Sequence, residues 1–309
     1  MTISQDFIGI DVSKSTLDVF EGARSKRIAN AGEPIAALVE RWRSKDVFVL
    51  FEATGQYDQL LQRALQAGGI GFARVNPARA RDFARAAGFL AKTDAVDAKM
   101  LAMMAERLRP KADAPVAQER EHLRMLHRRR DQLVHMRQQE RTRLSEAREP
   151  EEKQSIVQHL AWLSGAIKDL DSRIRHFIAS VGPLKQACSK LRKAPGIGPV
   201  AATTLLALMP ELGTRSPKTI AALAGLAPLN RDSGIERGKR TIAGGRRRVR
   251  EALYMAALAA VRSSDHFAKL YKAFIAAGKA KKLALIAIAR KLLIALNAMI
   301  RDDTDFKPV

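Results

Sequence analysis

The chain has 309 residues, more than the roughly 100–150 of a typical single domain, so we expect at least two domains. Lysine and arginine total 54 against 32 aspartate and glutamate, and the resulting net charge of +22 indicates a polyanionic partner. Residues 1–110 hold 16 basic and 13 acidic residues whereas residues 111–309 hold 38 and 19, a division that excludes a uniformly basic ribosomal or nucleoid protein.

Residues 6–110 alternate strand and helix signals. The predicted strands cover residues 7–12, 17–20, 27–29, 47–51 and 71–75, and the predicted helices lie near residues 35–42, 57–67 and 94–108. Three successive antiparallel strands followed by helix, strand, helix, strand and helix is the order of the RNase H-like fold. We therefore expect an α/β domain over residues 1–112.

Long charged helices follow in residues 113–185. The second of them has apolar residues at alternating spacings of four and three, which is typical of a coiled-coil seam. The seam residues are Ile156, Leu160, Leu163, Ile167, Leu170, Ile174 and Phe177. This pattern predicts a helical hairpin that packs on itself or on another subunit.

Residues 186–309 predict a second, all-α domain. Its start, Pro195-Gly196-Ile197-Gly198-Pro199, resembles one helix-hairpin-helix unit, and helices are expected at 216–224, 246–260 and 280–300 around a loop at about 228–245. Gly196 and Gly198 are predicted to present backbone amides to DNA phosphates, although an ordinary connecting turn explains them equally well.

Nothing in the sequence indicates secretion or a membrane. The chain opens without a charged and apolar leader, and the apolar run 283–300 contains Arg290, Lys291 and Asn297, which favours a packed helix over a membrane span. Cys188 is the single cysteine and is interpreted as a core thiol. We expect a cytoplasmic protein.

Four acidic residues fall where an RNase H-like fold would gather them. Asp11 ends an apolar run in the first strand, and Glu52 follows the apolar residues of the central strand. Asp94 and Asp97 are three residues apart and share a helical face. Carboxylates this close repel one another unless a cation neutralises them, and Mg²⁺, or Mn²⁺ in its place, takes such oxygen ligands. The four residues therefore predict a metal site for phosphoryl transfer.

Each carboxylate also has an ordinary explanation. Asp11 could end a turn, Glu52 could be a surface residue, and Asp94 could cap the helix that begins there. Their agreement with the fold order favours the metal site.

A glycine-rich basic segment lies near residue 240. Seven of the 14 residues from 237 to 250 are basic, and glycines let a backbone approach phosphates closely. Ser233 precedes them in a Ser-Gly pair that by itself indicates only a turn, and the rival nucleophile Tyr254 lies in an apolar helix that favours a packing role. The predicted nucleic-acid contacts are Arg231, Arg237, Lys239, Arg240, Arg246, Arg247, Arg248 and Arg250.

Several short motifs carry a family resemblance. They are Ile8-Gly9-Ile10-Asp11 with Lys14, Glu52-Ala53-Thr54-Gly55, Asn76-Pro77, the run 92–98, Pro195-Gly196-Ile197-Gly198 and Arg231-Asp232-Ser233-Gly234. In this order and spacing they resemble the DEDD insertion-sequence transposases, which are bridge-RNA-guided recombinases. The resemblance extends over nearly the whole chain.

The resemblance implies a RuvC-like nuclease domain, a coiled-coil segment and a C-terminal transposase domain in a bacterial, nucleoid-associated enzyme. It implies that Ser233 attacks DNA to form a phosphoserine link, and that the metal site of Asp11, Glu52, Asp94 and Asp97 acts with it. It also implies catalytic sites assembled across the subunits of a dimer or tetramer, and a structured guide RNA that pairs with donor and target DNA.

Two other functions fit part of the pattern. A RuvC-like junction nuclease would use the carboxylates with water and leave Ser233 unused. A non-catalytic nucleic-acid-binding scaffold would explain the charge and the coiled coil but leave the four carboxylates without a role.

Overall fold

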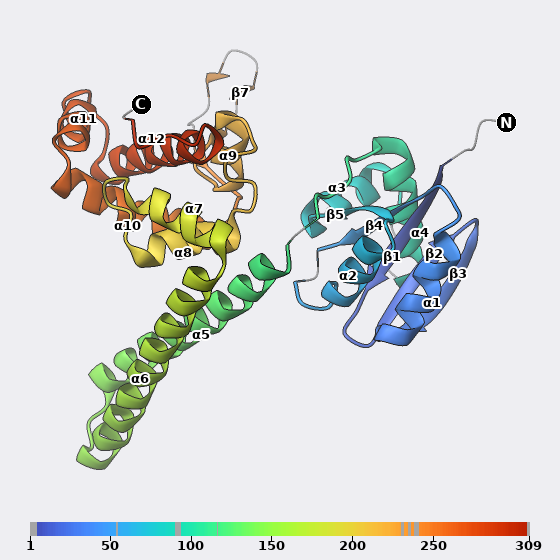
Figure 1. Cartoon of the computed structure of the whole chain (residues 1–309), viewed down its shortest axis with the longest axis horizontal. Helices are drawn as coiled ribbons and strands as arrows, with labels where there is room; N and C mark the ends of the chain where they lie inside the picture. Colours follow the sequence, from blue (N-terminus) through green and yellow to red (C-terminus); the bar gives the residue numbers. More distant parts are fainter. Residues whose placement is uncertain are drawn as a thin grey trace. The chain divides into compact units, whose positions relative to one another are not determined.

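The computed structural model describes residues 5–53, 55–89, 94–115, 117–229, 232–233, 236–237 and 241–307. For Asp94, Ala95, Leu229 and the segments 232–233 and 236–237 it describes the backbone alone. The chain divides into two compact units, Met1–Pro115 and Val116–Val309 (Figure 1). The first unit is a mixed α/β structure and the second is mostly helical.

The first unit is built on a five-stranded sheet with the order β3-β2-β1-β4-β5. The three N-terminal strands are antiparallel, and β4 and β5 run parallel to β1. The strands are β1 (Asp6–Val12), β2 (Thr16–Glu21), β3 (Arg24–Ala29), β4 (Val47–Glu52) and β5 (Gly71–Val75). The order of the five strands matches the prediction.

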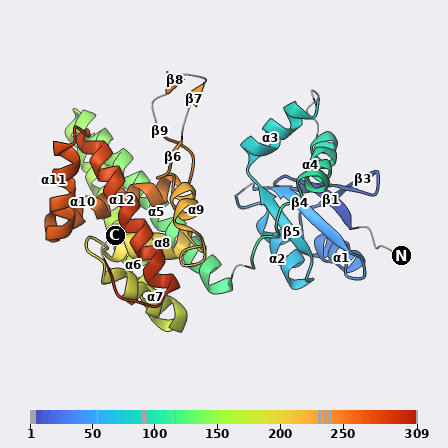
Figure 2. The same ribbon diagram turned by 90° about the horizontal axis from the view of Figure 1, so that it is seen from above.

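Helices cover both faces of this sheet (Figure 2). Alternation along β1 sends Ile8, Ile10 and Val12 into a core with α1 (Gly32–Trp42) and α2 (Gln59–Ala67). The opposite face packs against α3 (Pro77–Ala86) and α4 (Asp94–Leu108). The two cores explain why β4 is apolar at consecutive positions, since it is buried on both faces.

Helix α3 was absent from the predicted elements. Three arginines and few apolar residues leave it with a weak periodicity, and Ala80 is its buried residue. Its start does carry a signal, because the Asn76 side chain accepts a hydrogen bond from the Ala78 amide and Pro77 occupies the first turn.

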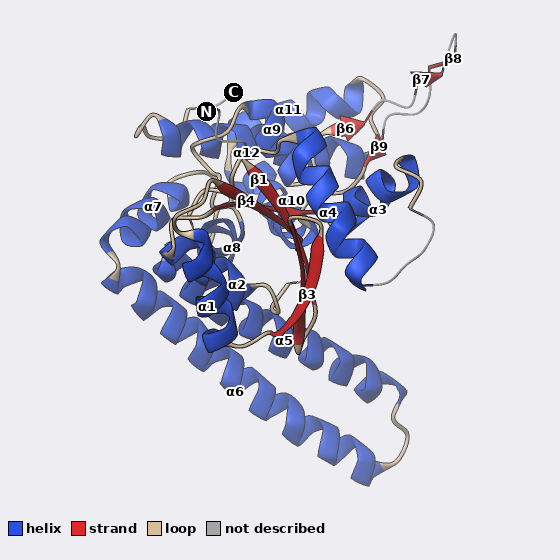
Figure 3. Cartoon of the chain, turned by 90° about the vertical axis from the view of Figure 1, so that its right-hand side faces the viewer, coloured by secondary structure: helices blue, strands red, loops and turns tan. Residues whose placement is uncertain are grey.

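The second unit begins with a helical hairpin of α5 (Gln118–Glu146) and α6 (Pro150–Ser180), drawn in Figure 3. The two helices pack on each other within one chain: Leu123, Leu126 and Leu133 of α5 share a core with Leu163 and Ile167 of α6. The last predicted seam residue, Phe177, is half-buried, and Ile178 is buried beside it.

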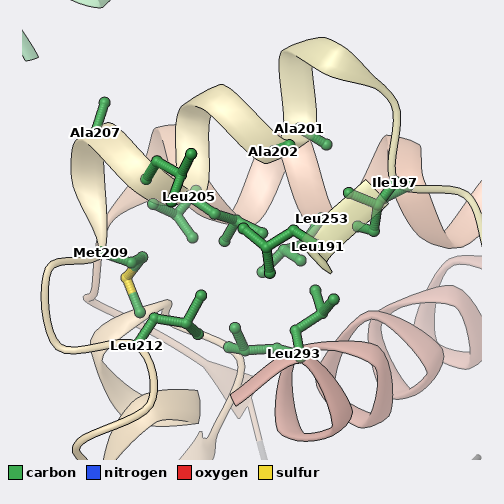
Figure 4. Packing of buried hydrophobic residues seen from close by; sticks show 14 of the residues in the cluster. Leu191, Ile197, Ala201, Ala202, Leu205, Ala207, Met209, Leu212, Leu253 and Leu293 are labelled. Carbon is green, nitrogen blue, oxygen red and sulfur yellow. The ribbon is translucent and has the colours of Figure 1, made fainter. Parts of the chain in front are cut away.

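A helical bundle completes this unit and continues the same hydrophobic core. Figure 4 shows Leu191, Leu205, Leu253 and Leu293 meeting at its centre. The helices are α7 (Gly182–Arg192), α8 (Pro199–Leu208), α9 (Pro217–Leu223), α10 (Arg247–Ser263), α11 (Asp265–Ala276) and α12 (Lys281–Arg301). Helices α7 and α11 were not predicted as separate elements.

Helix α12 is long and apolar enough to span a membrane by length and composition. Its apolar residues are instead used inside the bundle, where Leu292, Leu293 and Leu296 are fully buried. The buried Asn297 side chain accepts a hydrogen bond from the Gly213 amide at 2.8 Å and donates one to the Arg215 carbonyl at 2.9 Å. These contacts fix α12 as a central helix of the core.

Candidate catalytic site

Asp11 and Glu52 lie at neighbouring positions on adjacent parallel strands. The register pairs Ile10 of β1 with Phe51 of β4, and each carboxylate follows its member of that pair. Alternation places both on the sheet face that carries Phe7 and Leu50, which is the face covered by α3 and α4. Both residues are half-buried.

Gly9 brings the backbone of α4 directly against β1. A Cβ atom at Gly9 would lie 1.9 Å from the Ala98 carbonyl oxygen and 2.4 Å from the Ala102 nitrogen, so any side chain would displace the helix. Asp97 immediately precedes Ala98, and Asp94 lies about one turn earlier on the same helix. This close approach brings the helix with the two predicted aspartates onto the strand that carries Asp11.

The side chains of the four predicted metal ligands are brought together less completely than the backbone segments that carry them. Asp97 is half-buried, and the Asp94 side chain lies outside the described residues. Among the side chains that are described, no three histidine, cysteine or acidic residues form a group that could hold a metal ion. A metal site here would therefore depend on Asp94 together with the three described carboxylates.

Asp18 is a fifth acidic residue on this face that the sequence analysis missed. It lies directly opposite Asp11 in the antiparallel pair of β1 and β2, and it is 8% exposed. Its carboxylate accepts hydrogen bonds from Nε of Arg27 at 2.9 and 3.2 Å. The signal was the same as for Asp11, an acidic residue within an apolar strand. Arg27 balances the charge of Asp18, which leaves this residue with a structural explanation.

Ser233 lies in a hairpin built from four two-residue strands. The inner pair is β7 (Asp232–Ser233) with β8 (Glu236–Arg237), where Ser233 faces Glu236. The outer pair is β6 (Pro228–Leu229) with β9 (Thr241–Ile242). The side chains of Ser233 and Arg237 are not described, and Arg231, Lys239 and Arg240 lie outside the described residues.

The two ends of this hairpin segment meet at a stem formed by Gly225 and Gly245. A Cβ atom at Gly245 would lie 2.1 Å from the Gly225 nitrogen, and the Arg246 amide donates a hydrogen bond of 2.8 Å to the Leu223 carbonyl. Arg250 adds a hydrogen bond to the Gly244 carbonyl at 2.8 Å. The stem thus fixes both ends of the Ser233 segment at one place in the bundle.

Two of the predicted nucleic-acid contacts form internal ion pairs. Arg246 donates two hydrogen bonds of 2.6 Å to Glu211, and Arg248 donates two to Asp131. Burial raises the pKa of Glu211, but the hydrogen bonds and charge of Arg246 outweigh it and leave this pKa below its ordinary value. The hydrogen bonds to Asp131 raise the pKa of Arg248.

Arg247 and the two predicted glycines have different surroundings. Arg247 is 84% exposed and pairs with Glu251 on its own helix. Gly196 has a φ of +77°, and a Cβ there would lie 2.2 Å from the Ala256 carbonyl oxygen, so this position is needed for packing. Gly198 caps α8 and has open space around it, as a backbone contact to phosphate would require. Tyr254 is half-buried on α10.

A buried histidine that the sequence analysis did not single out lies beside Arg248. His127 is 2% exposed, its Nε2 forms a 2.9 Å hydrogen bond with Oγ1 of Thr204, and its Nδ1 lies 3.5 Å from Asp131. Burial lowers its pKa, an effect opposed by Asp131 and reinforced by Arg248. The contact joins α5 to α8 and could not be anticipated from one histidine among charged residues.

Comparisons with known proteins agree with this organisation. Residues 188–272 match the family described as "Transposase IS116/IS110/IS902 family", and residues 8–147 match a second family described as "Transposase", of the DEDD IS110 type. A pilin gene-inverting protein of Moraxella bovis is 30% identical over 317 residues, which cover 98% of each chain. The chain belongs to the IS116/IS110/IS902 transposase family.

Insertion-element proteins match a shorter part of the chain. The IS110 uncharacterized 43.6 kDa protein of Streptomyces coelicolor is 32% identical over 120 residues, which cover 38% of this chain and 29% of that protein. The family resemblance inferred from the motifs is confirmed. This transposase is accordingly a DNA-binding enzyme that cuts and rearranges DNA.

Proposed function

We propose that this transposase breaks and rejoins DNA strands through a covalent bond to Ser233, in a reaction that requires a metal ion held by Asp11, Glu52, Asp94 and Asp97. One observation carries the metal part of the proposal. The carboxylates of adjacent strands β1 and β4 share the face on which α4, the helix with the other two aspartates, packs closely at Gly9.

The topology of the first unit supports an RNase H-like, RuvC-like fold. Its sheet combines an antiparallel β3-β2-β1 meander with the parallel strands β4 and β5, and it has helices on both faces. The chemistry of the donor set fits a hard divalent ion, because all four predicted ligands are carboxylates. Bound Mg²⁺ would stabilise the negative charge that develops on the scissile phosphate.

Ser233 would act as the nucleophile. Its Oγ attacks the phosphorus of a phosphodiester, the Ser–O–P bond forms, and the bond from phosphorus to a deoxyribose oxygen breaks. The serine loses its proton and the departing oxygen gains one, so the number of phosphoester bonds is unchanged and no nucleotide is consumed. A deoxyribose hydroxyl of the partner strand then displaces Ser233 and rejoins the DNA.

The gene-inverting relative supports a reaction that conserves bonds. Its name describes inversion of a gene, an outcome in which cut ends are rejoined in a new arrangement. A hydrolytic nuclease that ends at a nick would leave rejoining to other proteins. Strand exchange through a protein-linked intermediate accounts for both steps within one enzyme.

Two partners complete the proposal. The basic excess in residues 111–309 provides for a structured guide RNA as well as for donor and target DNA. The α5–α6 hairpin is proposed to join subunits as a coiled coil, because Val157 and Trp162 remain 51% and 59% exposed after the seam is buried within the chain.

Trapping the covalent intermediate tests the nucleophile. DNA spanning the gene's own flanks, nicked near the junction so that the released strand diffuses away, should leave the protein attached to DNA. Digestion and mass spectrometry should locate the adduct on Ser233. The Ser233→Ala variant should form no adduct and lose recombination by about 10³-fold or more, while it retains duplex binding.

Matched variants separate this function from its rivals. Recombination that persists in Ser233→Ala would exclude the serine mechanism, and nicking alone in that variant would indicate a water-using nuclease. Asp11→Asn should abolish adduct formation at any Mg²⁺ concentration without loss of DNA binding. Unchanged recombination in Asp11→Asn would exclude a catalytic metal site there.

A further inference from the structure

A groove lies between α6, α7 and α8 in the second unit, and its described lining residues all lie outside the Ser233 segment. Its main pocket has a volume of about 500 Å³. A second pocket of about 250 Å³ shares Arg175, Pro199 and Thr203 with the first and therefore continues it. We call the two together the α6–α8 groove.

Among the described residues, the lining of the main pocket includes four cationic side chains and no acidic one. Arg175 comes from α6, Lys185 and Arg192 come from α7, and Lys193 caps α7; all four are exposed. Within the part of the chain that is described, no carboxylate pairs with Arg175, Lys185 or Arg192. In the adjoining pocket, Arg130 is neutralised by Asp171 at 2.6 Å. The free positive charge is thus gathered in the main pocket.

The chain's own carboxylates already bind beside these cations. After α12, Asp303 pairs with Lys190 and Asp305 pairs with Lys193 at 2.7 Å, and Phe306 packs near Phe267 with 6.0 Å between ring centroids. Two acidic side chains at alternate positions therefore follow the basic face of α7. Anionic oxygens are held where the spaced phosphates of a nucleic-acid strand could compete for the same lysines.

The lining favours duplex backbone over unpaired bases. Among the described residues, the main pocket contains no aromatic ring on which a base could stack, and such stacking is the usual basis of single-strand and sequence-specific RNA binding. Thr203 and the first turn of α8 add polar groups suited to phosphate oxygens. Because the family acts on DNA, duplex DNA is the partner that this surface fits.

We propose that the α6–α8 groove binds the phosphate backbone of duplex DNA, and that Asp303 and Asp305 compete with the DNA for the edge of the groove. The proposal requires that the transposase binds DNA, and it does not depend on Ser233 or on the metal site. Its contribution is independent of sequence, so it positions a duplex without selecting it.

Cys188 allows a direct test in the natural protein. It is the single cysteine and it lines the groove, so a maleimide reports on this site alone. Burial raises its pKa, and the alkylation is therefore followed at about pH 8.5. A saturating 30-base-pair duplex should slow alkylation by about fivefold or more. An unchanged rate with duplex bound would overturn the proposal.

Charge variants provide the second measurement. The double variant Arg175→Gln and Arg192→Gln should raise the Kd for duplex DNA about tenfold and reduce the slope of log K against log salt by about 2. Its control, Lys269→Gln with Lys272→Gln on α11, removes the same charge from exposed positions outside the groove and should leave protection of Cys188 unchanged. An equal loss of duplex affinity in both double variants would overturn the proposal.

Two further measurements test which ligand occupies the groove and whether Asp303 and Asp305 compete with it. Asp303→Asn with Asp305→Asn should tighten duplex binding, and unchanged affinity would exclude competition by this segment. Protection of Cys188 at lower concentration by a duplex RNA of equal length would overturn the assignment to DNA. Ser233→Ala should retain full protection, so failure of the serine mechanism is distinguishable from failure of this site.

Discussion

Arg248 on α10 donates two hydrogen bonds to Asp131 on α5, at 2.6 and 3.0 Å between nitrogen and oxygen. Arg248 stands in the first turn of the helix that follows the Ser233 segment, and Asp131 stands in the hairpin. The pair therefore connects the helix at the base of the candidate nucleophile to the hairpin helices.

Asp131→Ala should lower the free energy of unfolding by about 2 kcal/mol, because it leaves the half-buried Arg248 without its carboxylate. Urea denaturation checks the value. The control is Glu251→Ala, which breaks the exposed pair with Arg247 and should cost less than about 0.5 kcal/mol. Equal losses of unfolding free energy in the two variants would show that the contact between α10 and α5 contributes no more than an exposed ion pair.

Gly9→Ala should destabilise the first unit by about 3 kcal/mol, since the methyl group would meet the backbone of α4. It should also abolish recombination, because α4 carries Asp94 and Asp97. Gly32→Ala, at a position in α1 with nothing within 4 Å of the added atom, should be neutral in both measurements. Full recombination activity in Gly9→Ala would show that catalysis does not require α4 to pack this closely on β1.

Stability should fall as the pH drops below about 6.5, the ordinary pKa of histidine from which that of His127 is lowered. The lowered folded-state pKa means that the unfolded chain binds a proton that the buried imidazole resists, so protonation favours unfolding. Urea denaturation between pH 7.5 and 5.5 should show this loss, and His127→Gln should reduce it. A pH dependence that His127→Gln leaves unchanged would contradict this prediction.

Trp162→Glu should dissociate the oligomer proposed to form through the hairpin. The indole is 59% exposed on α6 and stacks on His159, so a charge there affects an intersubunit contact more than the chain's own core. Light scattering after size exclusion should show a monomer. Met255→Glu, at a residue 63% exposed on α10, should keep the oligomer, and an unchanged mass for both variants would locate the interface elsewhere.

Hydrophobic periodicity was sufficient to predict the elements whose burial follows a regular pattern. Alternation in β1 and the apolar run in β4 predicted both strands and their order, because burial on one face or on two leaves a direct mark on the sequence. It failed for α3, where arginines obscure the apolar face and a capping residue is the main signal. It also gave no sign of α7 or α11 as separate helices.

The charged residues of the sequence were harder to interpret than the pattern of apolar residues. The basic run near residue 246 predicted phosphate contacts, yet Arg246 and Arg248 find carboxylates 35 and 117 residues away in the sequence. Such partners are brought together by tertiary folding, and a single sequence carries no local sign of them. The positions of Asp11 and Glu52 were predictable because the strands that hold them are adjacent in a recognisable order.

The stem at Gly225 and Gly245 makes the Ser233 segment a detour from the bundle. The chain leaves α9 and returns to α10 at nearly the same point, with Arg246 bonded back to Leu223. A change in the length or composition of this detour would not alter the path of the surrounding helices. The fold thus lets the segment that carries the proposed nucleophile change in length without moving the helices that support it.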